Sequence, residues 1–349
     1  MNLLVFSGMN DNKLKSKLEP LAASDRVDRI FLLRKKPLDC PKVTSLKLPV
    51  FLRVSGIQEY VKFVWAFVFV FFHPVDCVMG IFLRPHGIFA HFVGKILNKP
   101  VIQIFPGNDV DFILRFSRIF VPLLRKARFI GVRGPKARDR LNMLVRDKKK
   151  FFIQHNEYTL TSLPVIKTEG RKKYDIICIA DFSRVKRIDV FLKVVGRLQR
   201  KYPRIRAVML GGGWQRGWYV FLRFIHELGS SVVFAGRVKD VFCYLKKSRV
   251  FLLTSQAEGM PMSVIEAMSA GIPCVLSDVG EIGDIINDGV NGFLVQPLDV
   301  GDFVEKIGRL LESEELSRKM AKNAFHTLEE KSGDYSRESN MKVWENVLS

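Results

Sequence analysis

The sequence lacks the patterns that mark disulfide-rich, zinc-binding and secreted proteins. Its five cysteines are scattered, with no C-x-x-C pair, which favours a reducing compartment and disfavours a structural zinc site. Its six histidines form no H-E-x-x-H or other metal-ligand spacing, so no metal is expected. The first residues lack the basic start, apolar core and cleavage site of a signal peptide, so none is expected.

Acidic residues are scarce, and the deficit is uneven. The formal net charge is +21, and residues 1–160 carry 28 Lys and Arg against 12 Asp and Glu, or +16. The remainder carries +5, so the basic character is assigned to the first half. Nucleic acid, an anionic membrane or an anionic acceptor would each account for this asymmetry, which disfavours the alternative of a merely solvated basic surface.

The most apolar segment, Tyr60–Phe72, is too short to cross a bilayer. A spanning helix needs about 20 apolar residues, and Lys62 interrupts this run. A core helix is the favoured interpretation. A surface that dips into the interfacial layer of a membrane is the alternative, and the basic residues of the same half support it.

A hydrophobic share of 48% over 349 residues is enough for a large core and favours two domains. Short apolar runs alternate with helical patterns, and the alternation resumes after a polar stretch at 159–173. The runs are LLVFSG, RIFLL, CVMGIF, PVIQIF and ARFIGV, then YDIICIA, AVMLGGG, SVVFAGR, RVFLLTS and PCVLSD. This order predicts an α/β chain with two doubly wound parallel sheets. We place one Rossmann-like domain at 1–165 and the second at 166–334, with a terminal helix at about 335–349 packing back on the first.

Loops that follow predicted strands in the first half hold candidate contacts, because doubly wound sheets bind ligands there. Gly8 would let backbone approach a ligand, with an ordinary turn as the alternative. Asn108 and Asp109, in PGNDVD, are candidate acceptor or sugar contacts. The alternative is a Gly-Asn turn in which Asp109 caps the next helix. His86, in RPHG, is the best candidate among the histidines.

The stretch from 255 to 271, SQAEGMPMSVIEAMSAG, is the most informative part of the chain. Pro261 has the fixed φ that suits a first helical position, so a helix is predicted to begin there. The first amides of a helix lack partners within it and, with the helix dipole, suit phosphate. Glu258 and Glu266 flank this end, and carboxylates bind hydroxyl groups rather than phosphate. A nucleotide sugar, with its sugar, diphosphate and ribose, has this layout.

Cations in other post-strand loops fit the same ligand. Arg184, Lys186 and Arg187 follow YDIICIA and would complete a diphosphate clamp, with a solvated basic turn as the alternative. Arg237 follows FAG, where a backbone edge would pair with a base. The glycines at 211–213 lack G-x-G-x-x-G spacing and indicate a turn rather than a dinucleotide fingerprint.

These residues together carry a resemblance. From about Tyr174 to Leu311 the chain resembles the donor domain of retaining glycosyltransferase family 4, whose GT-B fold has two Rossmann-like domains that face a central cleft. Glu258 and Glu266, separated by seven residues in EGMPMSVIEAMSAGIPCV, match the family signature. The segments GEIGDIINDGVNGFLV, FAGRV and DFSRVKRID are similar to the family's following segment, base loop and cation loop.

The resemblance implies a role for each matching residue. Glu266 would bind the ribose hydroxyls, Glu258 the transferred sugar, and Lys186, aided by Arg184, the leaving diphosphate. The remaining implied donor contacts are Arg237 and Val238, the pocket residues Gly259, Met260 and Pro261, and the amides of Ser263 and Val264. Gly8 is a further candidate donor contact, from its place after the first predicted strand. The family retains anomeric configuration and uses no metal or other cofactor. Glu258 then need not be a covalent nucleophile, because the two carboxylates flank a phosphate site instead of one anomeric carbon.

Three positions depart from the family pattern. Asp181 stands where the family has an arginine, five residues before the lysine. Arg187 stands where a glycine usually follows that lysine. Pro106 stands where many members have a histidine before G-x-D. The resemblance therefore identifies the donor side of the site better than the acceptor side.

The leading hypothesis is a hexosyltransferase that moves a sugar from a nucleotide-sugar donor to a lipid-linked or glycan acceptor in envelope polysaccharide or glycoconjugate synthesis. We expect it in the cytoplasm, peripheral on the inner face of an anionic membrane, with no nucleic acid partner. Alternatives are a sugar-nucleotide epimerase or phosphorylase of similar fold, and a non-catalytic GT-B-like protein that binds a glycan or polyanion.

Overall fold

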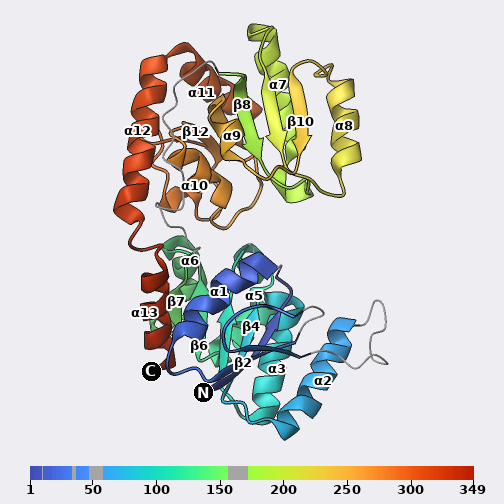
Figure 1. Cartoon of the computed structure of the whole chain (residues 1–349), viewed down its shortest axis with the longest axis vertical. Coiled ribbons are helices and arrows are strands. Elements are labelled where there is room, and N and C mark those ends of the chain that lie inside the picture. Colours follow the sequence, from blue (N-terminus) through green and yellow to red (C-terminus); the bar gives the residue numbers. More distant parts are fainter. Residues whose placement is uncertain (10, 34–36, 47–57, 108, 156–171) are drawn as a thin grey trace. The chain divides into compact units, whose positions relative to one another are not determined.

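The structure, a computed structural model, describes residues 1–9, 11–33, 37–46, 58–107, 109–155 and 172–349. It divides into two compact units, shown in Figure 1. Unit 1 comprises Met1–Tyr158 and Gly333–Ser349, and unit 2 comprises Thr159–Ser332. The predicted boundaries were 165/166 and 334/335, and the chain passes between the units at 158/159 and 332/333.

Unit 1 is built on a parallel sheet with the strand order β3-β2-β1-β4-β5-β6-β7. The strands are β1 (Asn2–Ser7), β2 (Arg29–Leu33), β3 (Val43–Leu46), β4 (Cys77–Ile81), β5 (Val101–Ile104), β6 (Phe129–Val132) and β7 (Phe151–Ile153). The strand order reverses between β1 and β4. These two strands are parallel neighbours, so their carboxyl ends lie side by side. Such a switch point is where doubly wound sheets bind ligands.

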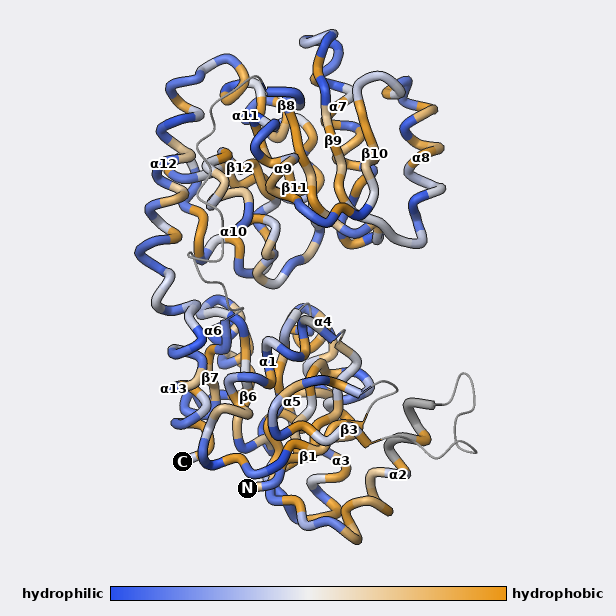
Figure 2. The backbone as a smooth tube through the Cα atoms, viewed as in Figure 1, coloured by the Kyte–Doolittle hydropathy of each residue, from blue (hydrophilic) through white to orange (hydrophobic). Residues whose placement is uncertain are grey.

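Helices cover both faces of this sheet. They are α1 (Asp11–Ala23), α2 (Gln58–Phe72), α3 (Ile88–Leu97), α4 (Asp109–Arg115), α5 (Ser117–Lys126), α6 (Pro135–Val145) and α13 (Arg337–Leu348), with the short turns η2 (Leu83–Gly87) and η3 (Lys148–Lys150). The central strands β1, β4 and β5 are buried almost throughout, as expected for a parallel sheet covered on two faces. Figure 2 colours the backbone by hydropathy. The strands are mostly apolar, and polar residues lie on the helices and loops.

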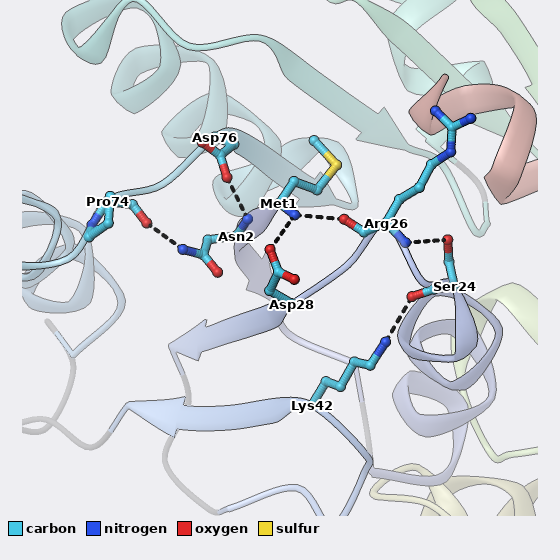
Figure 3. A network of polar contacts seen from close by, with 8 residues as sticks. All are labelled: Met1, Asn2, Ser24, Arg26, Asp28, Lys42, Pro74 and Asp76. Atoms are coloured by element: carbon cyan, nitrogen blue, oxygen red, sulfur yellow. Dashed lines mark hydrogen bonds and ion pairs between the residues drawn. The ribbon is translucent and has the colours of Figure 1, made fainter.

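A polar network holds the amino ends of β1, β2 and β4 together (Figure 3). The Met1 amine donates to the carbonyl oxygen of Arg26 and to Oδ2 of Asp28, both at 2.6 Å. The Asn2 amide donates to Oδ2 of Asp76 at 2.6 Å. This amine also lowers the pKa of the exposed Asp28 carboxyl. The network lies at the sheet edge opposite the ligand edge, so its role is structural.

The end of the chain belongs to unit 1. Helix α13 places Trp344, fully buried, in the core cluster that contains Leu3 and Val5. The Trp344 ring lies 5.2 Å from the Phe152 ring, centroid to centroid. Buried aromatic rings dominate core energetics, so this helix is an integral part of the unit.

Unit 2 has a second parallel sheet with the order β10-β9-β8-β11-β12-β13. Its strands are β8 (Tyr174–Ile179), β9 (Ala207–Leu210), β10 (Val232–Gly236), β11 (Ser248–Leu253), β12 (Cys274–Ser277) and β13 (Phe293–Val295). Its helices are α7 (Ile188–Lys201), α8 (Arg216–Ile225), α9 (Phe242–Leu245), α10 (Met262–Ser269), α11 (Val300–Glu312) and α12 (Glu314–Lys331), with the turns η5 (Arg184–Lys186) and η6 (Ile282–Asp284). The order reverses between β8 and β11, which are paired neighbours. The predicted α/β class, two doubly wound Rossmann-like sheets, is confirmed.

Helix α2 has a buried face, as the core-helix interpretation predicts, and an exposed apolar face. Ala66 and Phe69 are buried in a core cluster of unit 1, as a core helix requires. Val64, Phe71 and Phe72 are exposed by 62%, 85% and 71% on the same helix. Within the described ranges, no helix combines the length and apolar character needed to cross a membrane.

Candidate active site

The switch point of the unit 2 sheet brings the predicted donor loops together. One loop leaves β8 and forms η5, and the other leaves β11 and leads into α10. The Gln256 amide donates to the Val185 carbonyl at 2.7 Å. The Thr254 hydroxyl donates to the carbonyl oxygens of Lys186, at 3.3 Å, and Arg187, at 3.0 Å. These bonds fix the cation loop against the glutamate loop.

Lys186 and Glu258 form the central ion pair of this site. The Lys186 ammonium donates to Oε1 of Glu258 at 2.5 Å, and the Ser255 hydroxyl donates to the same oxygen at 2.6 Å. The Glu258 side chain is only 8% exposed and that of Lys186 is 22% exposed. A carboxylate this buried needs its partners, because an unpaired buried charge is costly. The pair therefore holds an ammonium and a carboxylate in contact at the ligand edge.

The start of α10 lies next in the chain. Pro261 precedes the helix with φ −75° and ψ 120°, and Met262 is the first helical residue, one position later than predicted. The extended ψ of Pro261 lets the chain turn into the helix from the preceding loop. The Val264 amide donates to the Pro261 carbonyl at 3.1 Å. In the described part of the chain no hydrogen bond occupies the Met262 and Ser263 amides, which makes these two the better candidates for phosphate.

Glu266 lies further along α10 and is half-buried. Burial raises the pKa of its carboxyl to about 7. A carboxyl held in a poorly hydrated position gains from ligand hydroxyl groups that replace the lost water. Its environment therefore suits the predicted role in ribose binding.

Gly280 supports the glutamate loop from behind, a contact that the sequence analysis did not identify. Its φ is +58°, and a Cβ at this position would lie 2.0 Å from the Glu258 carbonyl oxygen. Only glycine allows such close backbone packing at a positive φ. Gly280 is therefore a positioning residue for Glu258 and Gly259.

Alanine at position 280 is expected to displace the glutamate loop. Gly289 offers a matched control, because its φ is +74° but a Cβ there would meet nothing within 4 Å. Both substitutions impose the strain of a left-handed alanine, about 1 kcal/mol or more, and only Gly280→Ala adds the clash. We expect Gly280→Ala to weaken donor binding at least about tenfold, measured by calorimetry. Equal affinity in the two variants would show that the Gly280 contact does not position the site.

A third loop at this edge follows β10. Arg237 and Asp181 lie 3.7 Å apart as an exposed ion pair, 79% and 66% exposed. Asp181, which stands where the family has an arginine, therefore faces a cation on the base loop instead of the phosphate position. Val238 follows in the same loop and is half-buried. Exposed pairs of this kind contribute little to stability, so Arg237 can exchange its partner for a ligand at low cost.

Two arginines flank Lys186. Arg187 has a left-handed backbone, φ 49° and ψ 50°, a conformation that glycine adopts more readily than other residues. Its guanidinium binds Asp189 in a bidentate pair at 2.9 and 2.8 Å, so its charge is already engaged. Arg184 is exposed and lines a cavity of about 760 Å³, together with Gln256 and Trp214. Of the two, Arg184 is the better placed to assist Lys186.

In unit 1 the switch point brings Gly8 and His86 together. A Cβ at Gly8 would lie 2.7 Å from Cε1 of His86, so the glycine makes room for the ring. Oδ1 of Asp109 accepts from the Leu83 amide at 2.9 Å, which ties the start of α4 to the loop after β4. Burial raises the pKa of Asp109. Asp109 thus has a structural role in holding the Leu83 amide, in addition to the predicted contact with an acceptor or sugar. Asn108 lies outside the described residues.

Metal ligands do not cluster in the described ranges: no group of three or more His, Cys, Asp and Glu side chains could hold an ion there. The positive charge at the donor edge comes from Lys186, Arg184 and Arg237. Sequence reasoning found these cations but missed Ser255 and Gly280. Ser255 stood three residues before Glu258 and could have been identified as its hydrogen-bond partner, whereas the Gly280 contact depends on the fold.

The sequence of the segment that holds this site is similar to a known protein family. Residues 163–327 match the family described as glycosyl transferases group 1. The match covers most of unit 2 and just under half of the chain. A glycosyltransferase of Haemophilus influenzae, described as uncharacterized, is 29% identical over 189 residues, 54% of this chain and 52% of that protein. A lipopolysaccharide 1,6-galactosyltransferase of Escherichia coli is 44% identical over 71 residues, 20% of each chain.

The fold extends further than the sequence similarity. The crystal structure of HepE from Anabaena, in complex with UDP and glucose, matches with a TM-score of 0.77 at 16% identity. It covers 100% of this chain and 99% of its own. The fold of both units is therefore that of the GT-B glycosyltransferases. The chain spans about half the length, or less, of the curated relatives it matches.

Proposed function

We propose that this protein is a retaining glycosyltransferase of family 4 that transfers a hexose from a nucleotide-sugar donor. The observation that carries the proposal is the Lys186–Glu258 ion pair at the unit 2 switch point, beside the start of α10. An ammonium, two helix amides and two carboxylates at one sheet edge suit a ligand with a diphosphate between hydroxyl-rich groups.

Each group then has a distinct task. Glu266 holds the ribose, and Glu258 holds the sugar, aided by the loop that Gly280 supports. Lys186, Arg184 and the Met262 and Ser263 amides stabilise the charge that develops on the leaving diphosphate. The acceptor hydroxyl passes its proton toward the leaving phosphate oxygen on the same face of the sugar, which retains the configuration. We propose that no metal or other cofactor takes part, because these cations supply the positive charge.

The acceptor is proposed to be a lipid-linked or glycan precursor of the cell envelope, used at an anionic membrane surface on the cytoplasmic side. The lipopolysaccharide galactosyltransferase similarity supports this class of acceptor. The exposed Phe71 and Phe72 of α2 and the +16 charge of residues 1–160 support the membrane. Arg34, Lys35 and Lys36, basic residues of the same half, lie outside the described residues.

A donor screen tests the function. Nucleotide release is measured with a panel of nucleotide sugars and polyprenyl-diphosphate-linked sugars as acceptors, with and without EDTA. We expect release that depends on both substrates and is unchanged by EDTA, with a product that keeps the donor's anomeric configuration. Conversion of the donor sugar without transfer would favour the epimerase. Tight polyanion binding without turnover of any donor would favour the non-catalytic binding protein.

A further inference from the structure

The outward face of α8 in unit 2 is an apolar stripe. Trp214, just before the helix, and Trp218, Phe221 and Ile225 recur at helical spacing, with Phe224 beside them. They are exposed by 80%, 55%, 50%, 53% and 78% respectively. Single exposed apolar residues are ordinary, whereas a contiguous group of large ones marks an interaction surface. We refer to these five residues as the α8 face. Their exposure indicates that this face binds a partner.

The inner face of α8 is firmly attached to unit 2. Tyr219 is buried, and its ring lies 5.8 Å from the Phe182 ring, centroid to centroid. The Arg223 guanidinium donates to the Val232 carbonyl at 3.0 Å, which joins the helix to the edge strand β10. The stripe is therefore the free side of a packed helix. Figure 1 shows α8 as the outermost element of the unit beyond β10.

The sequence on both sides of α8 is strongly basic. From Lys193 to Arg249 the sequence has thirteen Lys and Arg against two acidic residues, a net +11. This segment runs from within α7 through β9, α8, β10 and α9 to the start of β11. Since residues 161–349 total only +5, the rest of that half is net acidic. The assignment of the basic character to the first half is thus incomplete, because unit 2 has a basic edge of its own.

We propose that the α8 face docks on an anionic lipid surface. Trp and Phe are side chains that favour the boundary between headgroups and acyl chains, and four of them, together with Ile225, make up the α8 face. No acidic residue occurs from Trp214 to His226, and Arg216 and Arg223 occur within the helix. Basic residues around an apolar stripe complement anionic headgroups. This docking surface belongs to unit 2 and is separate from α2, so it goes beyond the proposed function.

Tryptophan quenching by brominated lipid tests the docking. The full-length protein with Trp65→Phe is mixed with phosphatidylcholine vesicles, with and without phosphatidylglycerol, whose acyl chains carry bromine. Trp344 is fully buried, so any quenching by the lipid comes from Trp214 and Trp218. We expect brominated anionic vesicles to quench their emission by roughly half, and neutral vesicles or high salt to abolish the effect.

Matched variants locate the contact. Phe221→Ser with Phe224→Ser is expected to lower vesicle affinity at least about tenfold, because two apolar anchors are lost. Val290→Ser, which removes a side chain 54% exposed outside the basic segment, should leave affinity unchanged. Phe71→Ser with Phe72→Ser tests α2 in the same assay and should leave Trp214 and Trp218 quenched. Donor binding should be equal in all variants, which separates this proposal from the proposed function.

Several results would overturn the proposal. Emission that brominated anionic vesicles do not change would exclude insertion of the α8 face, as would equal binding by the Phe221→Ser, Phe224→Ser variant. Concentration-dependent dimers that this variant abolishes, without vesicle binding, would show that a second copy of the chain covers the face. Circular dichroism of each variant confirms that the fold is intact.

Discussion

Replacement of Lys186 by methionine is expected to lower kcat by about two to three orders of magnitude. The ammonium is the best-placed cation at the unit 2 switch point, and methionine keeps the length of the side chain without its charge. The substitution also leaves the Glu258 carboxylate, 8% exposed, with only the Ser255 hydroxyl as a partner among the described contacts. Nucleotide release under saturating donor measures the effect.

A matched control separates catalysis from the general loss of an ion pair. Lys201 forms an exposed pair with Glu312 at 2.7 Å in the same unit, 62% and 53% exposed. Lys201→Met also removes a lysine ammonium, but one that is far more exposed than that of Lys186. We expect it to leave kcat unchanged. If Lys186→Met and Lys201→Met had the same kcat as the wild type, Lys186 would have no role in the leaving-group step.

Glutamine at position 266 is expected to weaken donor binding about a hundredfold and to stabilise the protein. Burial raises the pKa of Glu266 from 4.5 to about 7, so between these pH values the folded state keeps a proton that the unfolded state has lost. The free energy of unfolding therefore falls as pH rises through this window. At pH 8 the ionised carboxylate costs at most about 3 kcal/mol, which glutamine removes.

Two measurements on Glu266→Gln decide the assignment. Denaturant unfolding of the ligand-free protein from pH 5 to pH 8 should show a fall in stability for the wild type that the variant lacks. Titration with a nucleotide sugar should show an affinity loss of about a hundredfold, because the carboxylate accepts bonds from two ribose hydroxyls. A stabilised variant with unchanged donor affinity would refute the ribose role while leaving the burial argument intact.

The donor loops could be predicted from sequence because their chemistry is local. Apolar runs separated by helical patterns indicated the parallel sheets, and the charged residues Lys186 and Glu258 followed directly after two of the strands. In a parallel sheet such positions share one edge, so their proximity followed from the topology. The fold class was confirmed, and the comparisons support the glycosyltransferase superfamily for most of unit 2.

Contacts between distant segments were beyond the sequence. The approach of Gly280 to the Glu258 carbonyl depends on how β12 ends, which no local pattern specifies. The exposed apolar face of α8 could not be predicted, because apolar periodicity does not say which face of a helix is covered. The net charge of residues 161–349 did not show the basic edge of unit 2, because acidic residues elsewhere in that half cancel its charge.

Hydrogen–deuterium exchange with and without the nucleotide sugar that the donor screen selects tests the central claim most directly, that the donor binds at the unit 2 switch point. We predict that this donor slows exchange of the Met262 and Ser263 amides and of the η5 loop around Lys186 by at least about tenfold at saturation. Gly280→Ala should weaken this protection and Gly289→Ala should not. Protection confined to the loops of unit 1 around Gly8 and His86, with no change at α10, would contradict the account.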